Sequence, residues 1–98
     1  MMAFTIPASH PALPGHFPGH PIVPAVVILD EMAEQLRAFS PGARIVKVAS
    51  AKFTAPLAPG ERCTVTFARR ADGLVRFTCA TSEREVASGW LELGEPLP

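Results

Sequence analysis

The stretch GHFPGHPIVPAVVILDEM, residues 15–32, organises the rest of the chain. It starts as a turn rich in His, Gly and Pro and continues into an apolar helix that carries an acid. An imidazole and a carboxylate are the usual groups for proton transfer, so His16 and Asp30, fourteen residues apart, are the first candidates for chemistry. Each also has a structural alternative: a loop histidine that bonds to nearby backbone, and a solvated acid on the polar side of a helix.

The size and composition predict one domain spanning residues 1–98 that associates with itself or with a relative. A hydrophobic fraction of 48% is high for a chain of 98 residues, because a small domain has much surface to cover with polar groups. Part of the apolar surface is therefore expected to face a partner or a ligand. Nine basic and nine acidic residues cancel, which argues against nucleic-acid binding.

The first six residues lack the basic region and long apolar run of a signal peptide. The longest apolar run, Ile22 to Leu29, has eight residues, whereas a membrane helix needs roughly 20. We therefore expect a cytoplasmic protein without a membrane span. Cys63 and Cys79 lie in runs that alternate like strands, and we expect both to be buried or half-buried free thiols rather than a disulfide or a reactive thiol.

Six prolines between Pro7 and Pro24 exclude a helix or a central strand there, because each lacks an N–H and restricts the residue before it. A disordered proline-rich linker is the alternative. Apolar residues such as Leu13, Phe17 and Ile22 favour a stiff, ordered loop instead.

The helix is predicted over residues 25–39, with Pro24 in its first turn and Ser40-Pro41-Gly42 ending it. Val27 is the one large apolar residue on the predicted polar side. Residues on one broad arc of the helical wheel are expected to be buried: Ala25, Val26, Ile28, Leu29, Met32, Ala33, Leu36 and Phe39.

After the helix the hydrophobic pattern changes to a period of two, which is typical of strands. The Ala71-Asp72-Gly73 turn indicates a hairpin, and Gly89 suggests a bulge in the last strand. These elements predict an α+β domain with an antiparallel sheet around one helix. The expected strands are residues 4–6, 44–54, 62–69, 74–81 and 85–93.

Two segments carry a resemblance to a known family. GHFPGHPIVPAVVILDEMAE, from Gly15 to Glu34, resembles the signature of the β-hydroxyacyl-(acyl carrier protein) dehydratases, which have the hot-dog fold. SAKFTAPLAPGE, from Ser50 to Glu61, resembles the strand and Pro-Gly turn of the same family. The resemblance implies a strongly curved sheet around a central helix. It also implies a homodimer with two sites, each taking its histidine from one protomer and its acid from the other.

Residue by residue, the resemblance makes His16 the catalytic histidine and Asp30 the catalytic acid, in preference to Glu31. Phe17 and Pro18 match packing residues of the family's loop, and Pro24 matches one of its later prolines.

Three further positions follow from the same comparison. Ile22 would offer a carbonyl that orients the imidazole. Ala25 stands where the family has Gly, and the backbone N–H groups of Ala25 and Val26 would face the thioester oxygen. Glu34 stands where the family often has Gln, which places a second negative charge near the site.

The implied reaction is the dehydration of (3R)-3-hydroxyacyl-acyl carrier protein to the trans-2-enoyl thioester, in fatty-acid or polyketide-like lipid synthesis such as aryl polyene assembly. No cofactor is required, and a metal site made of His10, His16 and His20 lacks the Cys or carboxylate partners expected of one. Two alternatives remain open: a hot-dog thioesterase, and a non-catalytic subunit that binds acyl carrier protein. Ala25 and Glu34 are the departures that keep the last one open.

The implied partner, acyl carrier protein, is acidic, so a basic mouth is expected beside the site. A solvated strand face is the alternative for any one of the candidate residues. The candidates are Arg44, Lys47, Arg69, Arg70 and Arg76.

Overall fold

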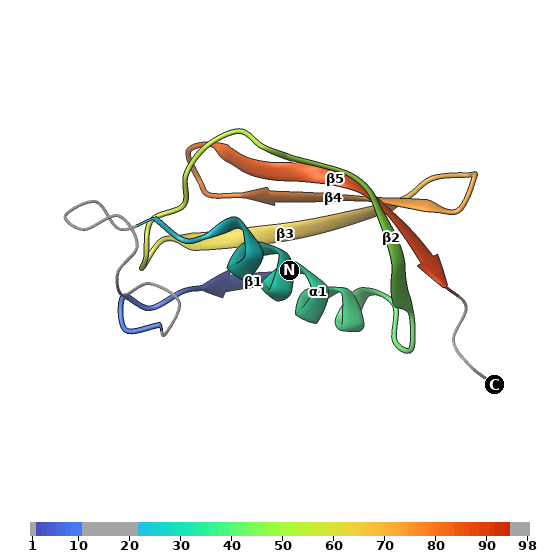
Figure 1. Ribbon diagram of the computed structural model, residues 1–98, viewed down its shortest axis with the longest axis horizontal. Coiled ribbons are helices and arrows are strands. Elements are labelled where there is room, and N and C mark those ends of the chain that lie inside the picture. The colour runs from blue at the N-terminus through green and yellow to red at the C-terminus, as the bar shows by residue number, and fades with distance from the viewer. Residues whose placement is uncertain (1, 11–21, 95–98) are drawn as a thin grey trace.

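The computed structural model describes residues 2–10 and 22–94, which form one helix and five strands (Figure 1). The elements follow one another in the order β1 (Met2–Thr5), α1 (Ala25–Phe39), β2 (Arg44–Phe53), β3 (Arg62–Arg69), β4 (Leu74–Ala80) and β5 (Glu85–Gly94).

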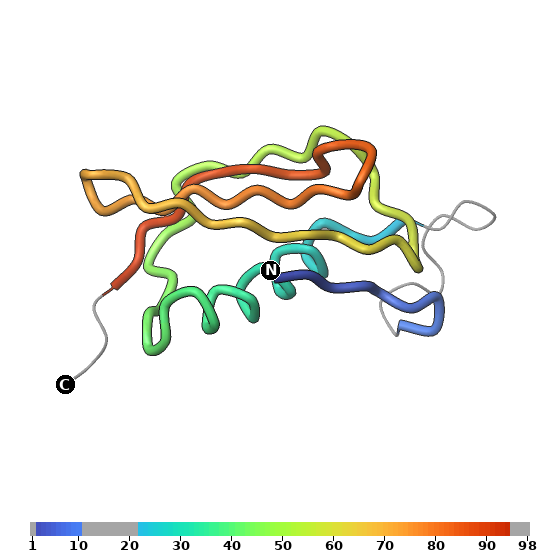
Figure 2. The backbone as a smooth tube through the Cα atoms, turned by 180° about the vertical axis from the view of Figure 1, so that it is seen from behind, coloured from blue at the N-terminus to red at the C-terminus, as the bar shows by residue number. Residues whose placement is uncertain are grey.

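The strands form a single antiparallel sheet in the order β1-β3-β4-β5-β2. β3, β4 and β5 make the predicted meander, whereas β2 crosses to the far side and pairs with β5. The sheet curves over α1, as the two opposite views show (Figures 1 and 2). This is the hot-dog fold and the α+β class that the sequence predicts.

The helix has the predicted boundaries. Pro24 is its N-cap, with φ −60° and ψ 147°, and its ring provides no side-chain acceptor for the first turn. At the other end the N–H of Ser40 donates to the carbonyl of Leu36 at 2.8 Å. Gly42 then takes a φ of 82°, a left-handed conformation that few other residues adopt at low cost. The described residues contain no helix long and apolar enough to cross a membrane.

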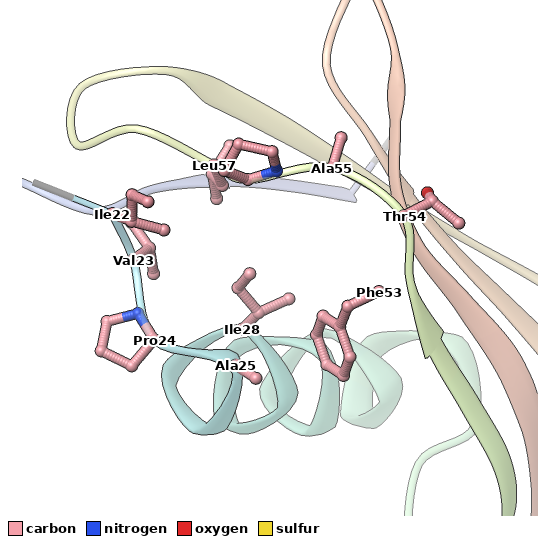
Figure 3. Close-up of a pocket in the computed structure, with 10 residues that line it drawn as sticks. Ile22, Val23, Pro24, Ala25, Ile28, Phe53, Thr54, Ala55 and Leu57 are labelled. Carbon is pink, nitrogen blue, oxygen red and sulfur yellow. The ribbon is translucent and has the colours of Figure 1, made fainter. Parts of the chain in front are cut away.

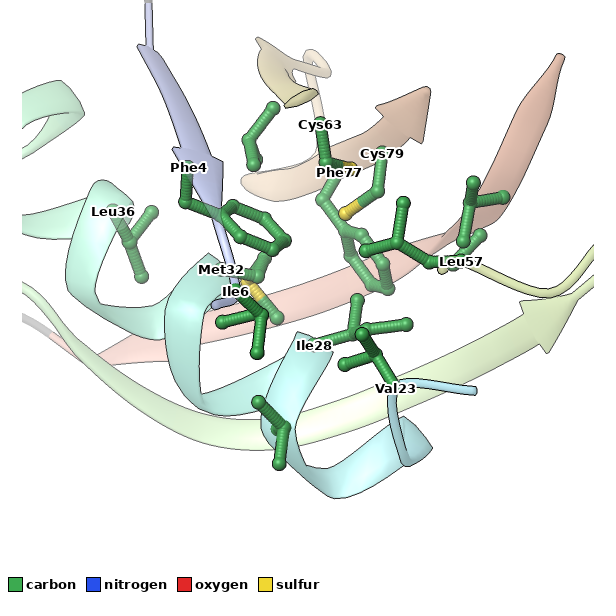
Figure 4. Close-up of a cluster of buried hydrophobic side chains, with 14 of the residues drawn as sticks. Phe4, Ile6, Val23, Ile28, Met32, Leu36, Leu57, Cys63, Phe77 and Cys79 are labelled. Carbon is green, nitrogen blue, oxygen red and sulfur yellow. The ribbon is translucent and has the colours of Figure 1, made fainter. Parts of the chain in front are cut away.

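The core lies between α1 and the concave face of the sheet (Figure 4). The helix contributes Val27, Ile28, Met32 and Leu36. The sheet and its connections contribute Phe4, Ile6, Leu57, Cys63, Val65, Val75, Phe77, Cys79, Val86, Ala87 and Leu91.

The predicted buried arc of the helix is wrong at its edge. Val26 is 62% exposed and Ala25 is also exposed, whereas Val27 is only 6% exposed. The helical wheel identifies the most apolar direction of the helix, but the helix packs against β1 and β3, and Val27 belongs to the resulting core. Val26 is left facing outward.

The predicted bulge near Gly89 is also displaced. The pairing of β4 with β5 shifts where Cys79 faces Ala87 and Ala80 faces Glu85, so Val86 is the extra residue. Gly89 has a steric role instead of forming the bulge. A Cβ at this position would lie 2.1 Å from the carbonyl oxygen of Ser50 and 2.7 Å from a ring carbon of Phe77, so the glycine allows a close approach within the sheet.

Cys63 and Cys79 are free and fully buried, as predicted. The hydrogen bond with Cys63 and the burial of the thiol raise the pKa of Cys79 far above its usual range. The thiolate is the reactive form of cysteine, so Cys79 is held in its inert state.

Candidate active site

A cavity of about 580 Å³ lies between the start of α1 and the segment that follows β2 (Figure 3). Its lining is almost entirely apolar, which suits an acyl chain or another apolar ligand. The lining residues are Ile22, Val23, Pro24, Ala25, Ile28, Phe53, Thr54, Ala55, Pro56 and Leu57.

The first wall is the chain that enters the helix. Val23 is 3% exposed and packs into the core, and its N–H donates to the carbonyl of Leu57 at 2.8 Å. This hydrogen bond joins the two walls of the cavity. The backbone that precedes Ala25 is therefore held at a set distance from the opposite wall.

The second wall leaves the sheet at Phe53 and stays attached to β5. The N–H groups of Thr54 and Ala55 donate to the carbonyl of Val86 at 2.9 and 3.4 Å. The hydroxyl of Thr54 donates to the carbonyl of Glu85 at 3.1 Å. Because that hydroxyl is engaged by the backbone, the side chain adds little polarity to the cavity.

The helix start forms the polar end of this apolar space. The first N–H groups of a helix have no acceptor within the helix, and the helix dipole gives this end a partial positive charge. The first turn of α1 carries no acidic residue that would offset it. Ala25 lines the cavity, so an oxygen that gains negative charge there would be stabilised.

The structure places the predicted site residues in two groups. Ile22, Pro24 and Ala25 line the cavity. Val26, Asp30 and Glu34 are exposed and follow one another at intervals of four along α1, so they share one face of the helix. The predicted His16, Phe17 and Pro18 lie outside the described residues.

Two acids, Asp30 and Glu34, lie on this exposed face of α1. Glu34 approaches Arg37 at 4.0 Å, and both side chains are more than half exposed. Asp30 lies on the open side of α1, outside the lining of the cavity. Within one chain, the candidate acid and the helix start that lines the cavity thus face different directions.

The family model for ApeI-like proteins, described as ApeI dehydratase, matches residues 1–90. The chain belongs to the ApeI-like family. Among curated relatives, the 3-hydroxyacyl-[acyl-carrier-protein] dehydratase FabZ of Wolbachia pipientis subsp. Culex pipiens is 33% identical over 85 residues. The match covers 74% of this chain and 59% of the relative. The chain therefore spans less than two thirds of the length of such relatives.

Two solved structures show the same fold. The dehydratase heterocomplex ApeI:P from Xenorhabdus doucetiae superposes with a TM-score of 0.80 at 21% identity, covering 95% of this chain and 84% of the other. A mutant of the fluoroacetyl-CoA-specific thioesterase FlK superposes with a TM-score of 0.69, also at 21% identity, covering 94% and 84%. The ApeI-like chain thus has the hot-dog architecture shared by both.

Sequence reasoning did not assign the second wall to the site. Phe53, Thr54 and Leu57 line the cavity, yet they are far in sequence from Gly15 to Met32. A signal was present in the SAKFTAPLAPGE segment, which resembles the strand and Pro-Gly turn of the dehydratases. Only the folded chain shows that this segment closes over the helix start.

Three of the five predicted basic residues, Arg69, Arg70 and Arg76, lie at or beside the turn between β3 and β4. The guanidinium carbons of Arg70 and Arg76 lie 4.4 and 5.5 Å from the centre of the Trp90 ring, and that of Arg69 lies 5.2 Å from the Phe39 ring. In Figure 1 the turn between β3 and β4 lies at one end of the long axis, well away from the start of α1. In one chain these arginines do not form the mouth of the cavity.

Proposed function

We propose that this ApeI-like protein dehydrates (3R)-3-hydroxyacyl thioesters of acyl carrier protein to trans-2-enoyl thioesters, in fatty-acid or polyketide-like lipid synthesis. One observation carries the proposal: an apolar cavity ends at the N-terminus of α1, where Ala25 lines it. The apolar walls would hold the acyl chain, and the helix start would meet the thioester carbonyl. The match to the ApeI-like family over residues 1–90 supports this reaction.

In the proposed reaction, neutral His16 removes a proton from the α carbon, and the electron pair moves toward the thioester carbonyl. The N–H groups at Ala25 and Val26 stabilise the enolate oxygen that forms. Protonated Asp30 then donates its proton to the hydroxyl at the β carbon, the C–O bond breaks and water leaves. His16 then holds one extra proton and Asp30 lacks one, so the transfer of a single proton from the imidazolium to the carboxylate restores both groups.

We propose that the site is completed by a second copy of the chain. Every residue of β2 except Ile45 is exposed, and Val46, Val48 and Phe53 are 57%, 43% and 40% exposed. β2 is also an edge strand, and an exposed apolar edge is a template for pairing with another strand. Joining two copies at β2 would cover these valines and bring Asp30 of one chain toward the cavity of its neighbour.

The same arrangement would account for the basic end of the molecule. If the two β2 strands pair antiparallel, the start of one lies beside the end of the other. The end of one chain that carries Arg69, Arg70 and Arg76 would then approach the cavity of its neighbour. An acidic acyl carrier protein would dock there by charge complementarity.

The test is the conversion of 3-hydroxyacyl-pantetheine thioesters to 2-enoyl products, and the hydration of 2-enoyl thioesters in reverse. His16→Ala and Asp30→Asn are each expected to lower the rate by at least about 10²-fold, the typical contribution of a general acid or base. Glu31→Gln is the matched control for Asp30→Asn and should keep most of the activity. Release of free thiol without an enoyl product would instead favour a thioesterase. Unchanged rates in both variants would refute the proposed site.

Mixing the two inactive variants tests the shared site. A mixed dimer of His16→Ala and Asp30→Asn chains contains one site that keeps both wild-type residues. Activity should therefore return when the variants are unfolded and refolded together, and remain absent when each is refolded alone. A failure of the mixture to recover activity would show that each chain uses its own histidine and acid. Recovery only with a different, related chain would indicate a heterodimer like the ApeI:P complex.

A further inference from the structure

An arginine that does not line the cavity contacts its second wall. Arg84 lies in the turn between β4 and β5, outside the cavity lining. Its Nη2 and Nε donate to the carbonyl of Pro56 at 2.8 and 3.3 Å. Pro56 belongs to the second wall and precedes Leu57, which is fully buried. Arg84 therefore holds the wall from its outer side.

The same guanidinium also forms a two-pronged ion pair with Glu61. Its Nη1 donates to Oε2 at 3.0 Å and its Nη2 donates to Oε1. Oε1 accepts a further hydrogen bond from the N–H of Ala58 at 2.9 Å. One arginine thus holds the turn that contains Pro56 and Ala58 at two points. A planar guanidinium can make this fork, and a lysine ammonium cannot.

The turn that carries Arg84 is itself well anchored. The N–H of Thr81 donates to the carbonyl of Arg84 at 2.9 Å. The hydroxyl oxygen of Thr81 accepts the N–H groups of Glu83 and Arg84, each at 3.2 Å. The guanidinium therefore starts from a closed turn, so its hold on Pro56 is backed by ordered backbone.

From this chain of contacts we infer that Arg84 is a positioning residue for the cavity. It holds Pro56, and the carbonyl of the next residue, Leu57, accepts a hydrogen bond from the N–H of Val23 at 2.8 Å. Val23 in turn sets the position of the backbone two residues before Ala25. Loss of the fork loosens Leu57, and the helix start then no longer has a set position relative to the apolar wall. The link to catalysis rests on the proposed dehydratase function, whereas the link from Arg84 to Val23 does not.

Arg84→Lys and Glu61→Gln test this inference, with Arg62→Lys as the matched control. Arg62 is an exposed arginine at the start of β3, next to Glu61. Two readouts are needed: the hydrogen-exchange rate of the Val23 amide, and kcat and KM for a 3-hydroxyacyl-pantetheine thioester. Both test variants should exchange the Val23 amide at least about tenfold faster, because local opening becomes easier. They should also raise KM, and thereby lower kcat/KM by about tenfold or more, because the thioester is misplaced. Arg62→Lys should change neither.

The outcomes separate a positioning role from a structural one. Faster Val23 exchange together with a raised KM, in both test variants and not in the control, supports the inference. A lower melting temperature with unchanged Val23 exchange and unchanged KM overturns it and leaves Arg84 a general stabiliser. If the wild-type protein forms no enoyl product, the dehydratase proposal fails, and the Val23 amide alone then decides whether Arg84 controls the cavity wall.

Discussion

β5 and β2 are neighbouring strands of equal length that pair with each other, yet they lie in different environments. β5 is buried at five of its ten positions and exposed at two, whereas β2 is exposed at nine of ten and buried at none. β5 lies between β4 and β2, and β2 is an edge strand. The difference in burial between the two strands therefore comes from their position in the sheet and not from their hydrophobicity.

β2 carries a row of apolar residues on one face, which is the pattern of a strand that buries that face. Ile45, Val48, Ala51 and Phe53 pair with Leu93, Leu91, Gly89 and Ala87 of β5, so they share the concave side with buried Leu91. Because α1 packs on β1 and β3 near the opposite edge of the sheet, Val48, Ala51 and Phe53 stay exposed in one chain, and only Ile45 of this row packs against the core. Substitutions in β5 should therefore mainly change the folding stability, and substitutions in β2 should mainly change the association of two chains.

Truncating a paired residue on each strand should give the largest contrast. Leu91 is fully buried and faces Val48, which is 43% exposed. Leu91→Ala should lower the free energy of unfolding by about 2–5 kcal/mol, from lost burial and the cavity left behind. Val48→Ala should lower it by less than about 1 kcal/mol in the monomer, because little apolar area is lost. Urea denaturation at several protein concentrations measures both, since association adds to apparent stability. Equal losses would contradict the contrast.

Exchanging glycine and alanine across the ladder gives a smaller contrast. Gly89 of β5 pairs with Ala51 of β2. Gly89→Ala should cost about 1–3 kcal/mol of folding free energy from overpacking, because its Cβ would meet the Ser50 carbonyl at 2.1 Å. Ala51→Gly should cost about 0.5–1 kcal/mol through backbone entropy. Thermal unfolding followed by circular dichroism measures both, and a Gly89→Ala protein as stable as wild type would contradict the close approach.

A charge on the concave face of β2 should break association while leaving the fold intact. Val48→Lys should weaken the proposed dimer at least about tenfold, equivalent to about 1.4 kcal/mol. Ser50→Lys is the control, because Ser50 pairs with Trp90 on the other face of the same strand. Sedimentation velocity across a range of concentrations gives the dissociation constants. If the wild-type protein stays monomeric at every concentration, the proposal that β2 mediates dimerisation is refuted.

The smallest effect concerns the contact that joins the segment after β2 to the turn before β5. The hydrogen bonds from Arg84 lower the pKa of Glu61. The stability that this pair contributes is complete above the unfolded pKa of about 4.3 and is lost as pH falls through the lower folded value. The melting temperature of the wild type should therefore exceed that of Glu61→Gln at about pH 6, and the difference should shrink below about pH 4. A constant difference down to about pH 3 would show that the ion pair is not responsible.

Local patterns in the sequence predicted most of the secondary structure. Pro24 and the Ser40-Pro41-Gly42 stop gave the correct ends of α1, since both act through the backbone of a few adjacent residues. The period of two located β2 to β5 within a residue or two. The same patterns could not place β2 beside β5, because pairing between distant strands depends on the whole sheet. They also assigned Val26 to the core, since a wheel contains no information on which side the neighbours lie.

For the site, the sequence by itself identified the family signature, the helix start at Ala25 and the candidate pair His16 and Asp30. These follow from short motifs, in which residue type and spacing express the chemistry directly. Only the tertiary structure brought Phe53 to Leu57 over the helix start and connected that wall to Arg84, because such contacts join residues about 30 positions apart. It also left β2 and the Val26 face open, since burial is decided by what packs against a residue and not by the residue itself.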